Sequence, residues 1–150
     1  MRVEYLTTKL PPVPAAALRR GEVGCLFPGS DGSLVSETRL RLSANSTHAL
    51  MGHGVIDALN ELPLEGRLGS GLQVLIPPAQ LEPVRRLFYL ADEKTYGGTY
   101  EFVLGVDSHR DEAVEYRIRI DNREYQNTLS GLQYLLRIAS REGMAVWMTI

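Results

Sequence analysis

The chain has one cysteine, one tryptophan and three histidines in 150 residues, and it has no long apolar run. The single cysteine, Cys25, cannot form an intrachain disulfide, so a secreted scaffold held by disulfides is excluded. No stretch approaches the roughly 18 apolar residues of a membrane span, and the first residues lack the apolar segment of a secretion signal. We therefore expect a soluble cytoplasmic protein.

The sequence also lacks an excess of one charge. It has 16 basic and 18 acidic residues, with six and seven in residues 1–66 and ten and eleven in residues 67–150. Nucleic-acid binding requires a basic field that displaces counterions, so we expect no nucleic-acid partner. Hydrophobic residues make up 44% of the chain and charged residues 23%, which is typical of a globular protein, and we predict one domain over residues 1–150.

Recognisable motifs for catalysis, metal binding or nucleotide binding are missing as well. The glycine-rich segment from Gly66 to Gly71 follows a predicted helix and opens a predicted strand, whereas phosphate-binding loops follow a strand and open a helix. We interpret it as a connector. Cys25 precedes Leu26 and Phe27 in an apolar strand, which predicts a small buried side chain rather than a reactive thiol. We expect no cofactor and no metal.

What the sequence does have is a strict alternation of apolar and polar residues in two segments. The apolar positions are Tyr100, Phe102, Leu104 and Val106 in the first segment, and Val114, Tyr116, Ile118 and Ile120 in the second. A period of two predicts strands that are covered on one face only. A helical pattern from Leu129 to Ala139 and an apolar strand from Ala145 to Ile150 follow, which predicts a C-terminal strand-strand-helix-strand unit.

The rest of the chain predicts further strands and helices. The strands are expected over residues 1–8, Glu22 to Phe27, Leu34 to Leu42 and Leu72 to Ile76, and helices over residues 45–62 and about 82–93, with a helical turn over 15–20. The helix of residues 45–62, capped by Asn45 or Ser46, would bury Met51, Val55, Ala58, Leu59 and Leu62. Gly52 and Gly54 weaken its first half, so we expect it to be regular only from near Gly54. Asn127 would cap the last helix, which ends at Gly143. The fold class is α+β, with a mainly antiparallel sheet of six or seven strands and about three helices. If the last strand joined the sheet of residues 113–120, its crossover would be parallel and right-handed.

Two groups of polar residues are candidates for catalysis. His53 and Asp57 are four residues apart on the predicted helix and would project from the same side, as a metal pair or an oriented base would, with His48 further round the helix. Asp107 and His109 lie in a polar reversal between the two alternating strands. A solvated helix face and a wet turn explain both groups, so we favour the noncatalytic interpretation.

Four arginines and two tyrosines are candidates for a binding surface. The arginines stand two residues apart on the polar sides of predicted strands, and arginine with nearby tyrosine is the combination that anchors protein interfaces. The set comprises Arg39, Arg41, Arg117, Arg119, Tyr125 and Tyr134. Cross-strand pairing with neighbouring glutamates is the simpler explanation for the arginines.

These patterns favour a noncatalytic protein-binding module with a one-to-one protein partner. Stoichiometric inhibitors and the immunity proteins that neutralise bacterial toxins belong to this class, which is suggested by size and by the absence of a catalytic motif. A small hydrolase or metal-dependent enzyme that uses His48, His53, Asp57 and His109 is the alternative. A small-ligand binder is the second alternative, with a pocket lined by Phe88, Tyr89, Tyr100 and Trp147.

Overall fold

The structure is a computed structural model that describes residues 2–5, 21–28, 30–31, 33–109 and 112–150. The strands are β1 (Arg2–Tyr5), β2 (Glu22–Pro28), β3 (Leu34–Arg41), β4 (Gln73–Ile76), β5 (Thr99–His109), β6 (Glu112–Asp121) and β7 (Ala145–Thr149). The helices are α1 (Ala44–Gly52), α2 (Val55–Asn60), α3 (Leu81–Lys94) and α4 (Asn122–Glu142), with a 3₁₀ turn over Pro78–Gln80 before α3. The helical turn predicted for residues 15–20 lies outside the described residues.

The strands divide into two sheets. One has the order β3-β2-β7-β4, and the other has the order β1-β6-β5. All pairings are antiparallel except the parallel pairing of β1 with β6. The predicted α+β class and the order strand, strand, helix, strand at the C-terminal end are confirmed. Because β7 and β6 belong to different sheets, the crossover considered for a shared sheet does not form.

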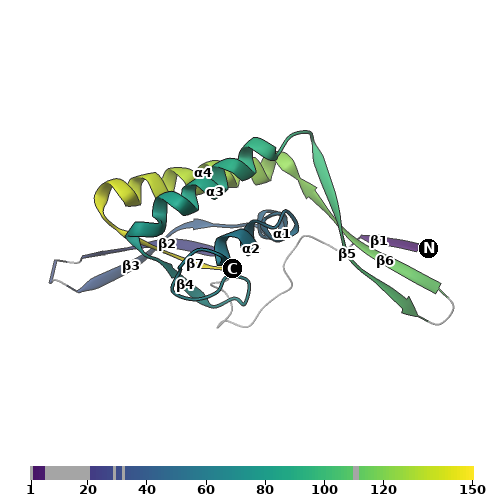
Figure 1. The fold of residues 1–150 in the computed structure, drawn as a ribbon, viewed down its shortest axis with the longest axis horizontal. Coiled ribbons are helices and arrows are strands. Elements are labelled where there is room, and N and C mark those ends of the chain that lie inside the picture. Colours follow the sequence, from purple (N-terminus) through teal and green to yellow (C-terminus); the bar gives the residue numbers. More distant parts are fainter. Residues whose placement is uncertain (1, 6–20, 29, 32, 110–111) are drawn as a thin grey trace.

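The four-stranded sheet carries the main core. In Figure 1, α3 and α4 lie side by side across one face of this sheet. The central strand β7 turns Val146 and Met148, both fully buried, toward one side of the sheet, and Trp147 on the opposite side is only 4% exposed. The prediction that the last strand is buried on both faces is therefore confirmed. We call this sheet with its helices the body.

Helix α4 begins earlier than the sequence predicts. The side chain of Asp121 accepts hydrogen bonds from the main-chain N–H groups of Arg123 and Glu124, at 3.0 and 3.2 Å, and so caps the helix. The predicted cap Asn127 is wrong, because it lies inside the helix. Gly143 ends the helix in the left-handed conformation with φ +67°, as predicted.

The predicted helix of residues 45–62 is broken into two. Gly54 has φ +75°, a left-handed conformation that separates α1 from α2. The buried side of α1 is polar at its start, since Asn45 exchanges two hydrogen bonds with the main chain of Asp121, at 2.8 and 3.0 Å. The prediction that Met51 faces the core is wrong, because its side chain is exposed.

The three-stranded sheet extends away from the body as an arm, which we define as β1, β5 and β6 (Figure 1). Strands β5 and β6 have 11 and 10 residues, so only the part nearest the helices can pack against them. At this root, Ile118 and Ile120 are buried in the core, and Phe102 packs against it. The outer part of β5 is exposed from Val103 to Ser108.

An irregularity in the arm changes which residues share a face. The register of β5 against β6 shifts between Val103 and Gly105, so that Val106 lies opposite Glu115. Glu115, Arg117 and Arg119 are two residues apart along β6 and therefore share one face, which we call the charged face of the arm. Val106 lies on this face, because it is opposite Glu115. The predicted apolar face of Tyr100, Phe102, Leu104 and Val106 is wrong at Val106.

Candidate functional site

Large apolar side chains on the arm are exposed to solvent. Val103 and Leu104 are each 50% exposed, Val106 is 55% exposed, and Val3 on β1 is 41% exposed. Val3 and Val106 both lie opposite Glu115, one on each side of it, so they flank the central strand on the same face. Grouped exposed apolar residues mark interaction surfaces more often than single ones do. The arm is therefore the main candidate for a binding surface.

A chain of four alternating charges runs along the same face of the arm. The Nε of Arg119 donates to the Oε1 of Glu101 at 2.8 Å, and the Nη1 of Arg117 lies 3.5 Å from the Oε2 of Glu101. Arg117 also donates to Glu115. Val103 lies opposite Arg117, so apolar and paired charged side chains alternate on this face. Such a surface combines apolar contact with a charge pattern that a partner must match.

The arm is joined to the body by a stack of rings. The ring of His53, at the end of α1, lies 4.3 Å from the ring of Tyr100 on β5 and 5.4 Å from the ring of Tyr125 on α4, as measured between centroids. Close by, a Cβ placed on Gly52 would lie 2.5 Å from the ring of Phe102. Partial burial lowers the pKa of His53, which favours the neutral imidazole. These contacts fix how β5 leaves the body.

Tyr125 does not contribute to a surface, contrary to the predicted binding set. Its side chain is fully buried, and its hydroxyl has no hydrogen-bond partner among the described residues. Burial raises the pKa of Tyr125 well above its usual range, and the nearby carboxylate of Asp92 adds to the shift. Helix α4 begins at Asn122, which places Tyr125 one turn before Leu129 on the inward face.

The predicted arginine pairs lie on different sheets. Arg39 and Arg41 are on β3 in the body, where they form ion pairs with Glu37 at 3.1 Å and Glu22 at 3.0 Å. Arg117 and Arg119 are on β6 in the arm, and the exposed Tyr134 is on α4. The structure thus does not bring the whole predicted set into one surface, although Arg39 and Tyr134 both line the groove described below. Each arginine pair is at least partly exposed and lies beside glutamates.

The candidate catalytic residues are also dispersed. Asp57 is on α2, across the left-handed Gly54 from His53, so the two residues are not four apart on one helix. His109 is nine residues beyond Tyr100 on β5, which at about 3.3 Å per residue puts its backbone about 30 Å from the ring stack. His48 is on α1, before the helix break. Within the described ranges, no three His, Cys, Asp or Glu side chains are grouped so that they could hold a metal ion.

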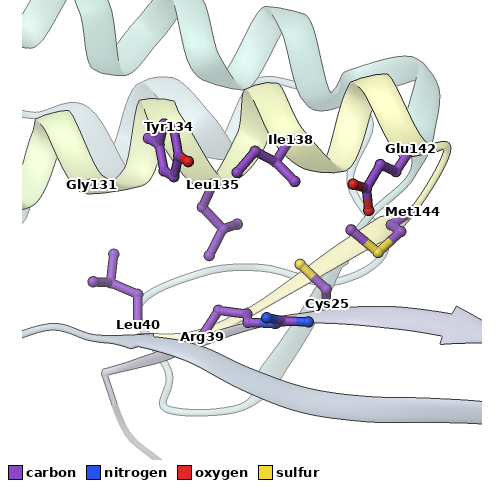
Figure 2. A pocket seen from close by; sticks show the side chains of 9 residues that line it. All are labelled: Cys25, Arg39, Leu40, Gly131, Tyr134, Leu135, Ile138, Glu142 and Met144. Atoms are coloured by element: carbon purple, nitrogen blue, oxygen red, sulfur yellow. The ribbon is translucent and has the colours of Figure 1, made fainter.

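A groove lies between α4 and the strands β2 and β3, and Figure 2 shows the side chains that line it. Its volume is about 480 Å³, and its lining is mostly apolar, with a charged or hydroxyl group at three positions. The lining residues are Cys25, Arg39, Leu40, Gly131, Tyr134, Leu135, Ile138, Glu142 and Met144. No sequence pattern predicted this groove, because its two walls are about a hundred residues apart in the chain.

Cys25 lies on the strand side of this groove (Figure 2). It is buried, as predicted, and burial raises the pKa of its thiol, while Arg39 partly opposes that shift and Glu37 adds to it. The thiol is therefore held in its protonated, less reactive form.

The aromatic residues predicted to line a ligand pocket do not meet. Phe88 is fully buried in α3, and its neighbour Tyr89 is exposed. Trp147 lies beside a second hollow, lined also by Leu26 and Leu75, on the sheet face opposite Met148. Tyr100 belongs to the ring stack at the root of the arm.

Comparisons with known proteins add no assignment, because no family model, curated protein or solved structure matches this chain. Among the described helices, none is both long and apolar enough to cross a membrane.

Proposed function

We propose that this protein is a noncatalytic protein-binding module of the cytoplasm, which uses its arm to contact one protein partner in a one-to-one complex. It would act as a stoichiometric inhibitor, of the kind that includes toxin-immunity proteins, by covering a surface of its target. The observation that supports this proposal is the exposed apolar set on the arm, formed by Val3, Val103, Leu104 and Val106.

The shape of the arm supports the same proposal. Strands β5 and β6 continue beyond the part that packs on the core, and this extension buries Val114 but leaves Val103, Leu104 and Val106 exposed. Such an extension is unfavourable in isolation, because exposed strand edges promote aggregation. A bound partner would remove both the apolar surface and the free edge from solvent.

The test is capture of the partner from an extract of the source cells by the tagged full chain. We expect one protein, retained at a one-to-one molar ratio by native mass measurement and unaffected by a chelator. The arm variant carries Val103→Thr and Val106→Thr, which keep the β-branched shape and replace a methyl group by a hydroxyl at each position. We expect it to bind the purified partner at least about 10-fold more weakly, since about 1.4 kcal/mol corresponds to a factor of ten.

Leu72→Thr is the matched control, because Leu72 is 70% exposed on the body, before β4. We expect this variant to bind the partner as the unmodified chain does. If the arm variant and the control bind equally well, the arm is not the binding surface. If the chain is purified with a metal ion and no protein partner, the module hypothesis is wrong.

The groove between α4 and β3 favours small-ligand binding as a second candidate function. Its volume of about 480 Å³ is within the range of about 300–1,000 Å³ of small-molecule sites. Gly131 lies in its helical wall, and a Cβ there would contact only the methyl groups of Leu40, at 3.7 Å. We expect any small molecule that raises the melting temperature through this groove to lose its effect in the variant Gly131→Leu, which fills the space. An unchanged effect would place the ligand elsewhere.

A further inference from the structure

The outer edge of β5 is a free strand edge. In the described part of the chain, β5 pairs only with β6, and the sheet order places it at the margin. About half of the main-chain N–H and C=O groups of an edge strand point away from its neighbour and need a partner or water. Residues 103–108 of this strand are all exposed, so its outer part is accessible to another chain.

Strand β5 has little of the usual protection of edges. Natural edge strands are blocked by charged side chains, lysine above all, by proline or by bulges. No lysine, arginine or proline occurs from Thr99 to His109, and the strand has a register shift between Val103 and Gly105. The five residues beyond that shift, from Gly105 to His109, pair regularly with β6, and their acidic side chain, Asp107, disfavours another acidic edge but attracts a basic one.

The hairpin that presents this edge is acidic. Residues 99–121 contain six acidic and three basic residues, a formal charge of −3, whereas the whole chain has −2 and the remaining residues therefore sum to +1. Within β5 itself, the charged residues are Glu101 and Asp107, both acidic. Asp107 is exposed in the regular part of the edge.

We propose that the edge of β5 binds an extended, basic segment of a partner protein, which adds a fourth strand to the arm. Main-chain hydrogen bonds to β5 would supply affinity, and basic side chains of the added strand would lie near Asp107 and the acidic hairpin. The target surface is then a basic one, such as a protein uses to contact phosphate groups. This inference rests on the proposed function and names the partner chemistry for the same arm.

The acidic charge of the hairpin favours a basic segment over a second copy of this chain as the strand that binds β5. Two hairpins joined along β5 would place two charges of −3 beside each other, with no basic residue on either paired strand. Like charges across a strand pair are unfavourable, whereas a basic segment neutralises the hairpin.

The test uses two fluorescent synthetic peptides about as long as β5, one alternating valine with lysine and the other valine with glutamate. Binding to the full chain is measured by anisotropy, and amide hydrogen exchange locates it. We expect the lysine peptide to bind at least about 10-fold more tightly, to weaken when the salt rises from about 50 to about 500 mM, and to slow exchange along β5. Equal binding of the two peptides, or protection elsewhere than β5, would overturn the proposal.

Two lysine substitutions form a matched pair of variants. Val106→Lys on β5 and Leu72→Lys on the body each replace an exposed apolar side chain by an ammonium group, and both change the net charge by +1. We expect Val106→Lys to weaken binding of the lysine peptide about 10-fold and Leu72→Lys to change it by less than about 2-fold, because only the first lies on the β5 edge. Equal weakening would show attraction by overall charge without strand addition.

Two further outcomes separate this inference from the proposed function. If the lysine peptide does not bind but a captured partner still depends on Val103 and Val106, the protein-binding function stands and strand addition at β5 is wrong. If sedimentation shows a dimer whose β5 amides are protected, the occupant is a second copy, and the basic partner is wrong.

Discussion

Gly52 provides a direct test of how the arm is seated on the body. It is the last residue of α1, and a Cβ added there would lie 2.5, 2.6 and 2.7 Å from three atoms of the Phe102 ring on β5. Ordinary contacts of a Cβ lie at 3.4–4 Å, so Gly52→Ala forces the ring or the helix to move. Gly52 is not among the glycines with positive φ, and alanine therefore fits its backbone.

The magnitude follows from two opposing terms. Alanine is favoured over glycine by up to about 1 kcal/mol in a helix interior and by less at a helix end. Overpacking of a fitted contact costs about 1–3 kcal/mol. We expect Gly52→Ala to lower the free energy of unfolding by about 1–2 kcal/mol, measured by urea titration, and to lower the melting temperature by about 4 °C.

A double-mutant cycle with Phe102→Ala isolates the clash. Phe102→Ala removes the three ring atoms nearest to Gly52, so only the helix term remains in that background. We expect Gly52→Ala to become neutral or stabilising by up to about 1 kcal/mol there, which reverses the sign of its effect. If Gly52→Ala destabilises the protein equally in both backgrounds, the destabilisation does not come from a clash with Phe102, and the glycine is not needed for the contact between α1 and β5.

Two further predictions concern the rings beside this contact. Burial lowers the pKa of His53 in the folded protein below the value of about 6.5 in the unfolded chain. The unfolded chain therefore binds the proton more readily, so the contribution of His53 to stability is complete above about pH 6.5 and is lost as the pH falls below that value. Urea midpoints at about pH 7.5 and about pH 5.5 should differ more in the unmodified chain than in His53→Gln, and equal differences would contradict this. Tyr125→Phe removes a buried hydroxyl that has no hydrogen-bond partner among the described residues, so we expect the free energy of unfolding to rise by up to about 1 kcal/mol. A fall of similar size in the free energy of unfolding, measured by urea titration, would show that the hydroxyl is hydrogen-bonded.

The sequence predicted the strands and helices well because their signals are local. Alternation marked β5 and β6, and the glycine at position 143 marked the end of α4. The division into two sheets was not predictable in this way, since it depends on pairings such as β1 with β6, between residues more than a hundred positions apart. Local patterns define a strand but do not select its neighbour.

The candidate site was predicted less well than the fold. The pair of His53 and Asp57 assumed one continuous helix, and Gly54 breaks that helix with a left-handed residue. The exposed arm did leave a signal: Phe102, Val103 and Leu104 are three consecutive apolar residues in otherwise alternating strands, so one of them had to face away from the core. The groove left no such signal, because its lining comes from separate elements.

The charge of the arm shows why composition did not reveal the surface. Residues 67–150 have ten basic and eleven acidic residues, but those outside the hairpin of residues 99–121 have seven basic and five acidic. The near-neutral half of the chain therefore combines an acidic hairpin with basic remaining segments. A partner at the arm experiences charges within about 8–10 Å at physiological salt, which is less than the length of the hairpin. The formal charge of −2 thus describes the average of the chain, and an acidic binding surface is compatible with it.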